Sequence, residues 1–229
     1  MDLKSIDEMW EMHLRCLDLA KIEEPLYVNI TGGLDSRVIA GVLKHQGYKI
    51  ANGCFFYNIA NCHNVPHVKK LVNILKYDNF EFKDSKTMGT VEDWGEPTEE
   101  MLKSTYVNNV YGDIATGSSL NKKKIRKYLQ WVIKNKIKYG DLRNHFKRVI
   151  DPFDNSIYIG FMFNLPKYLR VYQRGYMLMI RKYLPNLYEI PRCFEKNQEP
   201  IDLNYYIPKR IISKIKRRIF NGHNKKTRL

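Results

Sequence analysis

A short stretch in the first quarter of the chain combines two adjacent glycines with oxygen-bearing side chains. Residues 31–36, which we call the glycine loop, read TGGLDS. Gly32 and Gly33 have no Cβ, so a bulky ligand can come close to the backbone, and unusual backbone angles cost little there. Asp35 adds a carboxylate to this stretch, and Ser36 adds a hydroxyl. These residue types suit a phosphate group.

The segments on either side predict the elements that must hold the glycine loop. The apolar run 26–30 reads as a buried strand, and residues 38–43 place apolar side chains at helical spacing. A helix that begins after the loop turns its first backbone N–H groups and the positive end of its dipole toward the loop. A Gly-Gly pair alone is more often only a turn, but the complete strand–TGGLDS–helix pattern is far more specific for phosphate.

The first half of the chain alternates between helical and strand patterns. Apolar side chains at helical spacing predict a helix over residues 5–20, with Ser5 as its N-cap, and another over residues 65–75. Residues 50–57 and 80–82 read as further strands. This order predicts an α/β fold with a parallel sheet and right-handed crossovers. Ligands of such sheets bind at the carboxyl ends of the strands, where the glycine loop lies.

The second half of the chain predicts helices and no clear strand. The helical patterns start at Thr98 and Asn121, cover residues 142–149 and 172–183, and run from a cap at Asp154 or Asn155 to Pro166. We therefore expect a parallel-sheet core with a helical C-terminal half.

The composition is that of a globular protein. The chain has 229 residues, of which 44% are hydrophobic and 28% charged. It shows neither an apolar run of roughly 20 residues, the length of a membrane span, nor the layout of a signal peptide. The cysteines Cys16, Cys54, Cys62 and Cys193 are scattered and are expected to be reduced thiols. We therefore expect a cytoplasmic protein.

The net charge of +15 is concentrated in a few segments. Residues 209–228 contain nine Lys or Arg and no acid, and residues 122–127 form a second basic run. Solvated lysines and a frayed tail are the simpler interpretation. The functional alternative is attraction to an anionic partner such as tRNA, another nucleic acid, a membrane surface or a nucleotide.

Three possible metal ligands lie close together after the second predicted strand. Cys62, His63 and His67 fall within six residues of each other and could bind zinc. A fourth ligand at usable spacing is missing from the sequence nearby, so a loop followed by a helix is the favoured interpretation.

The glycine loop resembles the SGGxDS pyrophosphate-binding loop of the N-type ATP pyrophosphatases, and residues 25–195 resemble the synthetase half of asparagine synthetase. Residues 112–118 (GDIATGS) resemble the second glycine loop of that family. Residues 151–155 (DPFDN) and 163–170 (FNLPKYLR) resemble its PFLD and LPxxLR segments, which point to this branch of the superfamily.

The resemblance implies a PP-loop ATPase core of the adenine nucleotide alpha hydrolase type, with ATP and Mg²⁺ as its cofactors. In that family a carboxylate is adenylated with release of pyrophosphate, and ammonia then displaces AMP. Aspartate is the family's default carboxylate. The ATP-binding residues that the resemblance implies are Ile30, Thr31, Gly32, Gly33, Asp35, Ser36, Arg37, Phe56 and Gly112. Asp35 and Asp113 are the implied metal ligands, and Asp113 and Lys147 are the candidate catalytic residues.

The chain departs from the family in three respects. Val110 and Ile114 stand where the family's second loop carries glutamates around the aspartate matched by Asp113. The family's upstream lysine has only Lys138 and Lys147 as candidates. The N-terminal glutaminase domain is missing from the sequence, so ammonia is expected to come from solution or from a separate glutaminase.

These departures leave two further hypotheses open. A nucleotide-binding module that no longer catalyses would explain Val110 and Ile114. A tRNA-modifying relative would explain the net positive charge and the basic tail. The predicted organisation is an N-terminal helix over residues 1–24, the ATP pyrophosphatase domain over residues 25–195 and a basic tail over residues 196–229.

Overall fold

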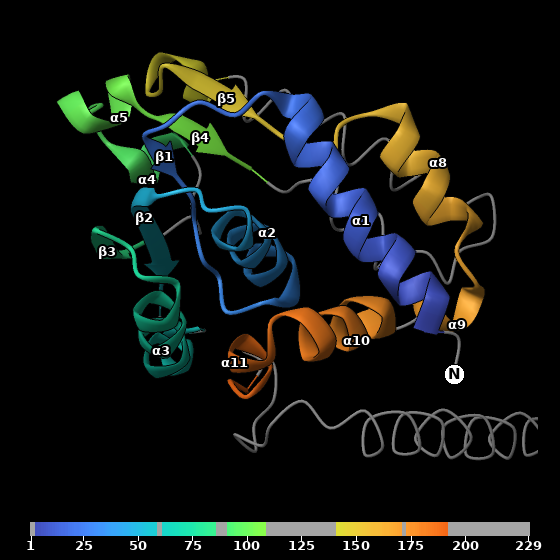
Figure 1. The fold of residues 1–229 in the computed structure, drawn as a ribbon. Helices are drawn as coiled ribbons and strands as arrows, with labels where there is room; N and C mark the ends of the chain where they lie inside the picture. Colours follow the sequence, from blue (N-terminus) through green and yellow to red (C-terminus); the bar gives the residue numbers. More distant parts are fainter. Residues whose placement is uncertain (1–2, 59–60, 86–90, 109–140, 171–172, 192–229) are drawn as a thin grey trace, which may run out of the picture.

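The computed structural model of the chain describes residues 3–58, 61–85, 91–108, 141–170 and 173–191. These residues form a five-stranded sheet with the order β3-β2-β1-β4-β5, and every neighbouring pair of strands is parallel (Figure 1). The strands are β1 Leu26–Tyr27, β2 Ile50–Tyr57, β3 Asn79–Asp84, β4 Thr105–Val107 and β5 Arg148–Ile150. The predicted α/β class with a parallel sheet is confirmed.

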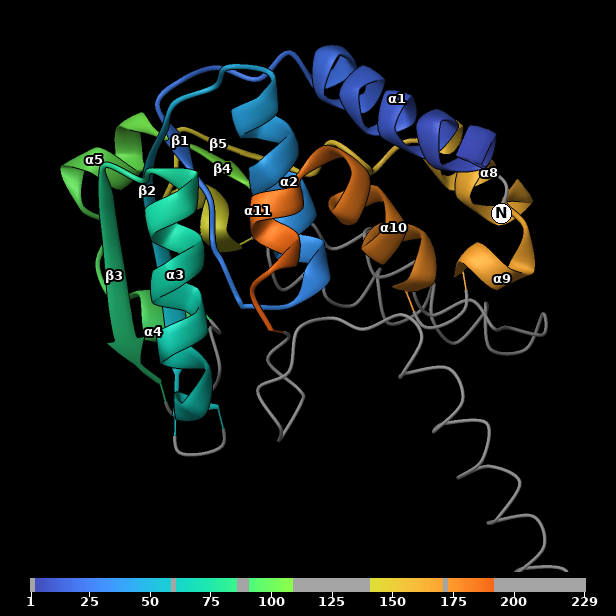
Figure 2. The ribbon, with the colours of Figure 1, turned by 60° about the horizontal axis from the view of Figure 1, so that its bottom comes forward.

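Helices cover the sheet and continue after its last strand. They are α1 Leu3–Ala20, α2 Leu34–His45, η1 Cys62–Asn64, α3 Val65–Leu75, α4 Val91–Trp94, α5 Glu99–Lys103, η2 Asp141–Asn144, α8 Ser156–Asn164, α9 Lys167–Arg170, α10 Arg174–Tyr183 and α11 Pro185–Tyr188. In Figure 2, α3 lies in front of β2 and β3, α2 and α11 lie next to it, and α10 continues this row of helices beyond the sheet. The predicted helix over residues 65–75 and strand over residues 50–57 are confirmed with these bounds.

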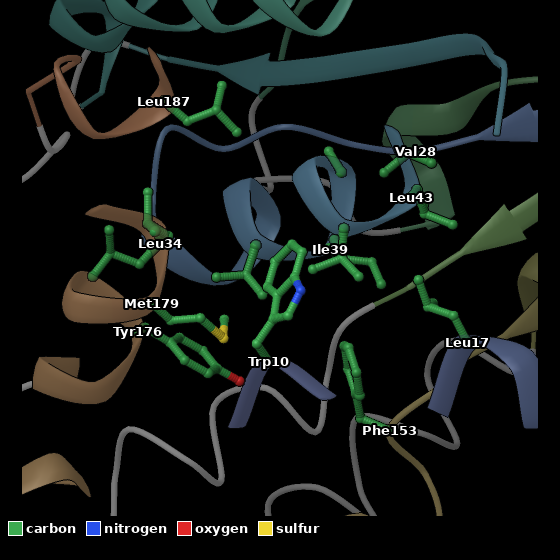
Figure 3. Packing of buried hydrophobic residues seen from close by; sticks show 14 of the residues in the cluster. Trp10, Leu17, Val28, Leu34, Ile39, Leu43, Phe153, Tyr176, Met179 and Leu187 are labelled. Atoms are coloured by element: carbon green, nitrogen blue, oxygen red, sulfur yellow. The ribbon is translucent and has the colours of Figure 1, made fainter. Parts of the chain in front are cut away.

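The main hydrophobic core lies between the sheet and the long helices. In Figure 3, Trp10 of α1, Ile39 of α2 and Met179 of α10 converge in this layer. A Cβ added at Gly41 would lie 2.5 Å from Leu184 Cδ1, so α2 and the start of α11 approach each other as closely as their backbones allow. Gly41 lies in the second half of α2, so this contact packs the start of α11 against that half of the helix.

A smaller aromatic cluster covers the opposite face of the sheet. Its buried members are Tyr27, Cys54, Phe56, Trp94, Met101, Tyr106, Leu142 and Phe146. Phe55, between two members of this cluster on β2, belongs to the main core instead. The alternation along β2 shows that the two clusters lie on opposite faces, because successive strand side chains point to opposite sides.

Two strands of the sheet were not expected from the sequence. The predicted helix over residues 142–149 is wrong, since that segment contains η2 and the start of β5. The helix capped by Thr98 is confirmed, but it ends at Lys103 and is followed by β4. Three-residue strands such as these are too short to show a period in the sequence. They are assigned by their pairing with neighbouring strands.

The ends of some predicted elements also differ. The first strand pairs only over Leu26–Tyr27, although the Val28 N–H still donates to Asn52 O over 2.9 Å. Helix α1 begins at Leu3, so Ser5 lies inside it and does not cap it. Asn155 does cap α8, because its side chain accepts a hydrogen bond from the Tyr158 N–H over 2.8 Å.

The basic helix predicted from residue 121, the second glycine loop and the basic tail lie outside the described residues. Among the described helices, none has the length and apolar character that crossing a membrane requires.

Candidate functional site

The glycine loop follows β1, the middle strand of the sheet, at its carboxyl end. Two hydroxyl groups close the loop on itself. The Thr31 N–H donates to Ser36 Oγ over 3.1 Å, and the two hydroxyl oxygens are 3.0 Å apart. The Gly33 N–H points at Thr31 Oγ1 over 3.4 Å. Thr31 and Ser36 therefore join the two ends of the loop through their side chains.

The two glycines have different roles in this turn. Gly32 has φ 73°, in the left-handed region where an L side chain is strained. Gly33 has extended angles and is the N-cap of α2. Because glycine has no side chain, no side-chain hydrogen bond caps α2 at Gly33, and the start of a helix favours an anion. This arrangement fits a phosphate at the start of the 12-residue helix α2.

Asp35 lies in the first turn of α2, next to this helix terminus. Its Oδ2 accepts a hydrogen bond from Gln173 Nε2 over 3.3 Å. Gln173 precedes α10 and was not among the residues expected at the site. Nothing in the sequence could have identified it, since the two residues are 138 positions apart. The contact brings the second half of the chain to the glycine loop.

Arg37, expected to bind ATP, has a structural role instead. Its side chain is fully buried. Its guanidinium donates to Gly32 O within the loop over 3.0 Å, to Leu187 O over 2.8 Å and to Ile190 O over 2.6 Å. A weaker bond reaches Pro191 O over 3.2 Å. The prediction for Arg37 is corrected because its donors bind backbone carbonyls, and the residue ties the glycine loop to the end of α11.

A buried polar network lies near the loop, between α1, α8 and α10. The hydroxyls of Tyr158 and Tyr176 are 2.6 Å apart, and His13 Nε2 is 3.4 Å from the Tyr158 hydroxyl. Burial raises the pKa of Tyr158 well above its usual value, and the charge of Asp35 adds to this effect. Burial lowers the pKa of His13 to about 4, against a smaller opposing effect of its bond to Met9 O. His13 is therefore neutral at pH 7.

Ile30 and Phe56, both among the residues expected to bind ATP, do not lie together. Ile30 is buried in the main core, whereas Phe56 belongs to the aromatic cluster on the opposite face of the sheet. Phe56 packs edge-to-face against Trp94, with ring centroids 5.1 Å apart. Alternation along β2 turns Phe56 to the face of the sheet opposite the main core, so the structure does not bring the side chains of Ile30 and Phe56 together.

Lys147, a candidate catalytic residue, lies at the wrong end of the sheet for that role. It immediately precedes β5, and its Nζ forms an exposed ion pair with Glu23 Oε2 over 3.0 Å. Both residues are at the amino ends of their strands, whereas the glycine loop is at the carboxyl end. The other expected residues of the site, Gly112, Asp113 and Lys138, lie outside the described residues.

The possible zinc ligands of the loop before α3 do not form a metal site. Cys62 is exposed, and within the described part of the chain no cluster of three or more His, Cys, Asp or Glu is close enough to hold a metal ion. Burial lowers the pKa of His67, and the positive charges of Lys70 and Arg37 add to this effect. The loop-and-helix interpretation of this segment therefore stands.

The donor set around the glycine loop fits a phosphate with a hard metal ion. Asp35 supplies a carboxylate, and Mg²⁺ is commonly held by one or two carboxylates together with substrate phosphates. The hydroxyls of Thr31 and Ser36 and the start of α2 supply neutral hydrogen-bonding groups for phosphate oxygens. Among the described residues, cysteine and histidine do not contribute to this set, so Mg²⁺ fits it better than zinc.

Comparisons with known proteins do not identify an activity for this chain. No family model matches the chain, and no curated protein matches it. Among solved structures it is similar to NMN synthetase from Francisella tularensis, with 12% sequence identity and a TM-score of 0.38 over 87% of this chain and 79% of that chain. A likeness of this size carries no argument about function.

Proposed function

We propose that the chain is an ATP-dependent, AMP-forming amide ligase of the asparagine synthetase type. One observation carries the proposal. The glycine loop closes through Thr31 and Ser36 at the carboxyl end of the central strand, and Asp35 stands at the uncapped start of α2. This geometry supports binding of the pyrophosphate end of ATP, because a helix start at the carboxyl end of a strand favours phosphate.

In the proposed reaction, a carboxylate oxygen attacks the α-phosphorus of ATP and the bond to the β-phosphate breaks. Pyrophosphate leaves with both electrons of that bond, and ammonia then attacks the acyl carbon and displaces AMP. The backbone of Gly32 and Gly33 and the first turn of α2 bind the leaving pyrophosphate. Asp35 would hold Mg²⁺, which when bound neutralises the charge on the leaving group.

The proposed reaction also needs an acceptor and a nitrogen donor, and the basic tail needs a partner. The acceptor is a small-molecule carboxylate, with aspartate as the first candidate. The nitrogen donor is ammonia, taken from solution or from a separate glutaminase. The basic tail over residues 196–229 is proposed to bind an anionic partner.

ATP–pyrophosphate exchange, screened over a panel of carboxylates that begins with aspartate, tests the proposal. We expect exchange that requires both Mg²⁺ and one carboxylate. Asp35→Asn keeps the shape of the side chain but removes its charge, and is expected to reduce exchange by about 100-fold or more. The matched control is Asp78→Asn, which removes an exposed carboxylate that pairs with Lys49 on the surface. Exchange that survives Asp35→Asn would contradict the assigned role.

A nucleotide-binding module without turnover is the second candidate. Val110 and Ile114 favour it, because they replace acidic residues beside Asp113 with side chains that cannot hold a metal ion or a proton. Tight Mg²⁺-dependent ATP binding with no pyrophosphate exchange for any carboxylate would select this candidate over the ligase.

A further inference from the structure

Gln173 reaches the glycine loop from a distant part of the chain. Its Nε2 donates to Asp35 Oδ2 over 3.3 Å. Gln173 is also the residue before α10, and its φ of 59° and ψ of 23° lie in the left-handed region that favours glycine. Since glycine would adopt these angles with less strain, a glutamine at this position points to a use for its side chain.

The packing of α10 holds Gln173 in place. A Cβ added at Gly175 would lie 2.8 Å from Met9 Sδ and 3.1 Å from Leu169 O, so the first turn of α10 packs directly against α1 and α9. In Figure 3 the side chain of Tyr176, from the same turn, points into the main core near Trp10. The amide of Gln173 therefore approaches Asp35 from a firmly packed helix.

An amide has a specific effect on a carboxylate that binds a metal ion. Its N–H group holds one carboxylate oxygen and so sets the rotation of the side chain. Because the amide is uncharged, the whole negative charge of Asp35 remains to attract a cation. A lysine or arginine in the same place would orient the carboxylate but would also compete with the cation for its charge.

We propose that Gln173 is a positioning residue for the metal ion that accompanies a nucleoside triphosphate, acting through Asp35. The inference rests on the proposed function, since it assigns Gln173 to the same site. Partners of this kind, one shell removed from a metal ion, typically change metal affinity by about 10-fold to 100-fold when they are lost.

Gln173→Gly removes the side chain but allows the backbone to keep its left-handed angles, so it tests the role of the side chain alone. Glycine favours the angles that this position requires, so we expect the melting temperature to stay the same or rise. ATP binding is measured by calorimetry over a series of Mg²⁺ concentrations, and again with EDTA. We expect the Mg²⁺ concentration at half-maximal binding to rise about 10-fold, while ATP binding in EDTA is unchanged. A merely structural role for Gln173 would not move the Mg²⁺ dependence.

Gln46→Gly is the matched control. Gln46 Nε2 also donates to a carboxylate, Asp18 Oδ1, over 3.0 Å, but this pair lies between α1 and the end of α2, away from the loop. Its loss is expected to leave the Mg²⁺ dependence unchanged. If Gln173→Gly does not fold, Gln173→Asn takes its place, because asparagine tolerates left-handed angles but its amide is one methylene shorter.

The outcomes separate this inference from the proposed function. An unchanged Mg²⁺ dependence in a folded Gln173 variant, with Mg²⁺-dependent ATP binding intact in the parent chain, overturns the role of Gln173 and leaves the proposed function standing. Failure of the parent chain to bind ATP in the presence of Mg²⁺ overturns both.

Discussion

Two arginines donate to backbone carbonyls at opposite ends of the sheet, and their surroundings differ. At the carboxyl end, Arg37 is fully buried and binds carbonyls of the glycine loop and of the segment that ends α11. At the amino end, Arg148 is exposed and binds Ala20 O and Lys21 O at the end of α1. Guanidinium bonds to carbonyls thus hold the glycine loop against α11 at one end of the sheet and cap α1 at the other.

This difference in burial indicates where the stability of the fold depends on a single side chain. Water can replace Arg148 at the carbonyls of α1, because these groups are at the surface. Around Arg37 water has no access, so the loss of the guanidinium leaves buried acceptors without donors. The carboxyl end should therefore be sensitive to substitution and the amino end tolerant. The predictions below test this contrast.

The largest expected effect is that of Arg37→Met, which keeps an apolar stem and removes the donors. We expect it to lower the free energy of unfolding by about 3–5 kcal/mol, because several carbonyls remain buried and unsatisfied. Arg148→Met is the matched substitution, with an expected loss of about 1 kcal/mol or less. Urea denaturation of both variants measures the difference, and equal losses would refute the contrast between the two ends.

The second prediction concerns His13, part of the buried network near the loop. Its pKa of about 4 in the folded chain lies below the usual value of 6.5. Between these two pH values the unfolded chain binds a proton that the folded chain does not, so stability falls as the pH drops from 6.5 to 4. The loss amounts to about 3 kcal/mol and is absent above pH 7.

His13→Phe is expected to remove this part of the pH dependence, measured as the difference in unfolding free energy between pH 7 and pH 4.5. His63→Gln, at an exposed histidine, serves as the control. If the parent chain and His13→Phe lose the same stability on acidification, the burial of a neutral His13 is not the cause.

The third prediction separates strain from function at two glycines with positive φ. Gly32 has φ 73° and lies in the loop, whereas Gly47 has φ 87° and follows α2 with open space around it. Alanine at either position should cost about 1–2 kcal/mol of stability, because both require left-handed angles. Only Gly32→Ala should also weaken ATP binding, which calorimetry can measure. Weaker ATP binding in Gly47→Ala would contradict this assignment.

The smallest effect is expected at the amino end. Lys147→Ala removes the exposed ion pair with Glu23, and surface pairs of this kind contribute little. We expect no measurable change in melting temperature or in ATP–pyrophosphate exchange. A large loss of exchange would restore Lys147 as a catalytic candidate and would require the chain to bring it to the other end of the sheet.

Much of the fold could be predicted because its signals are local. The spacing of Val68, Leu71 and Leu75 specifies α3, and Asn155 caps α8 through a bond to a residue three positions away. Strands β4 and β5 escaped prediction because three residues show no period, and their pairing partners are distant in sequence.

The sequence by itself determined the glycine loop. Its hydroxyls, glycines and aspartate are adjacent in the chain, so their chemistry is set by short-range geometry. Only the tertiary structure decided what surrounds the loop. It turned Arg37 inward to carbonyls 150 or more positions away and brought Gln173 to Asp35. Such contacts depend on how whole helices pack against the sheet, which residue spacing within one segment does not encode.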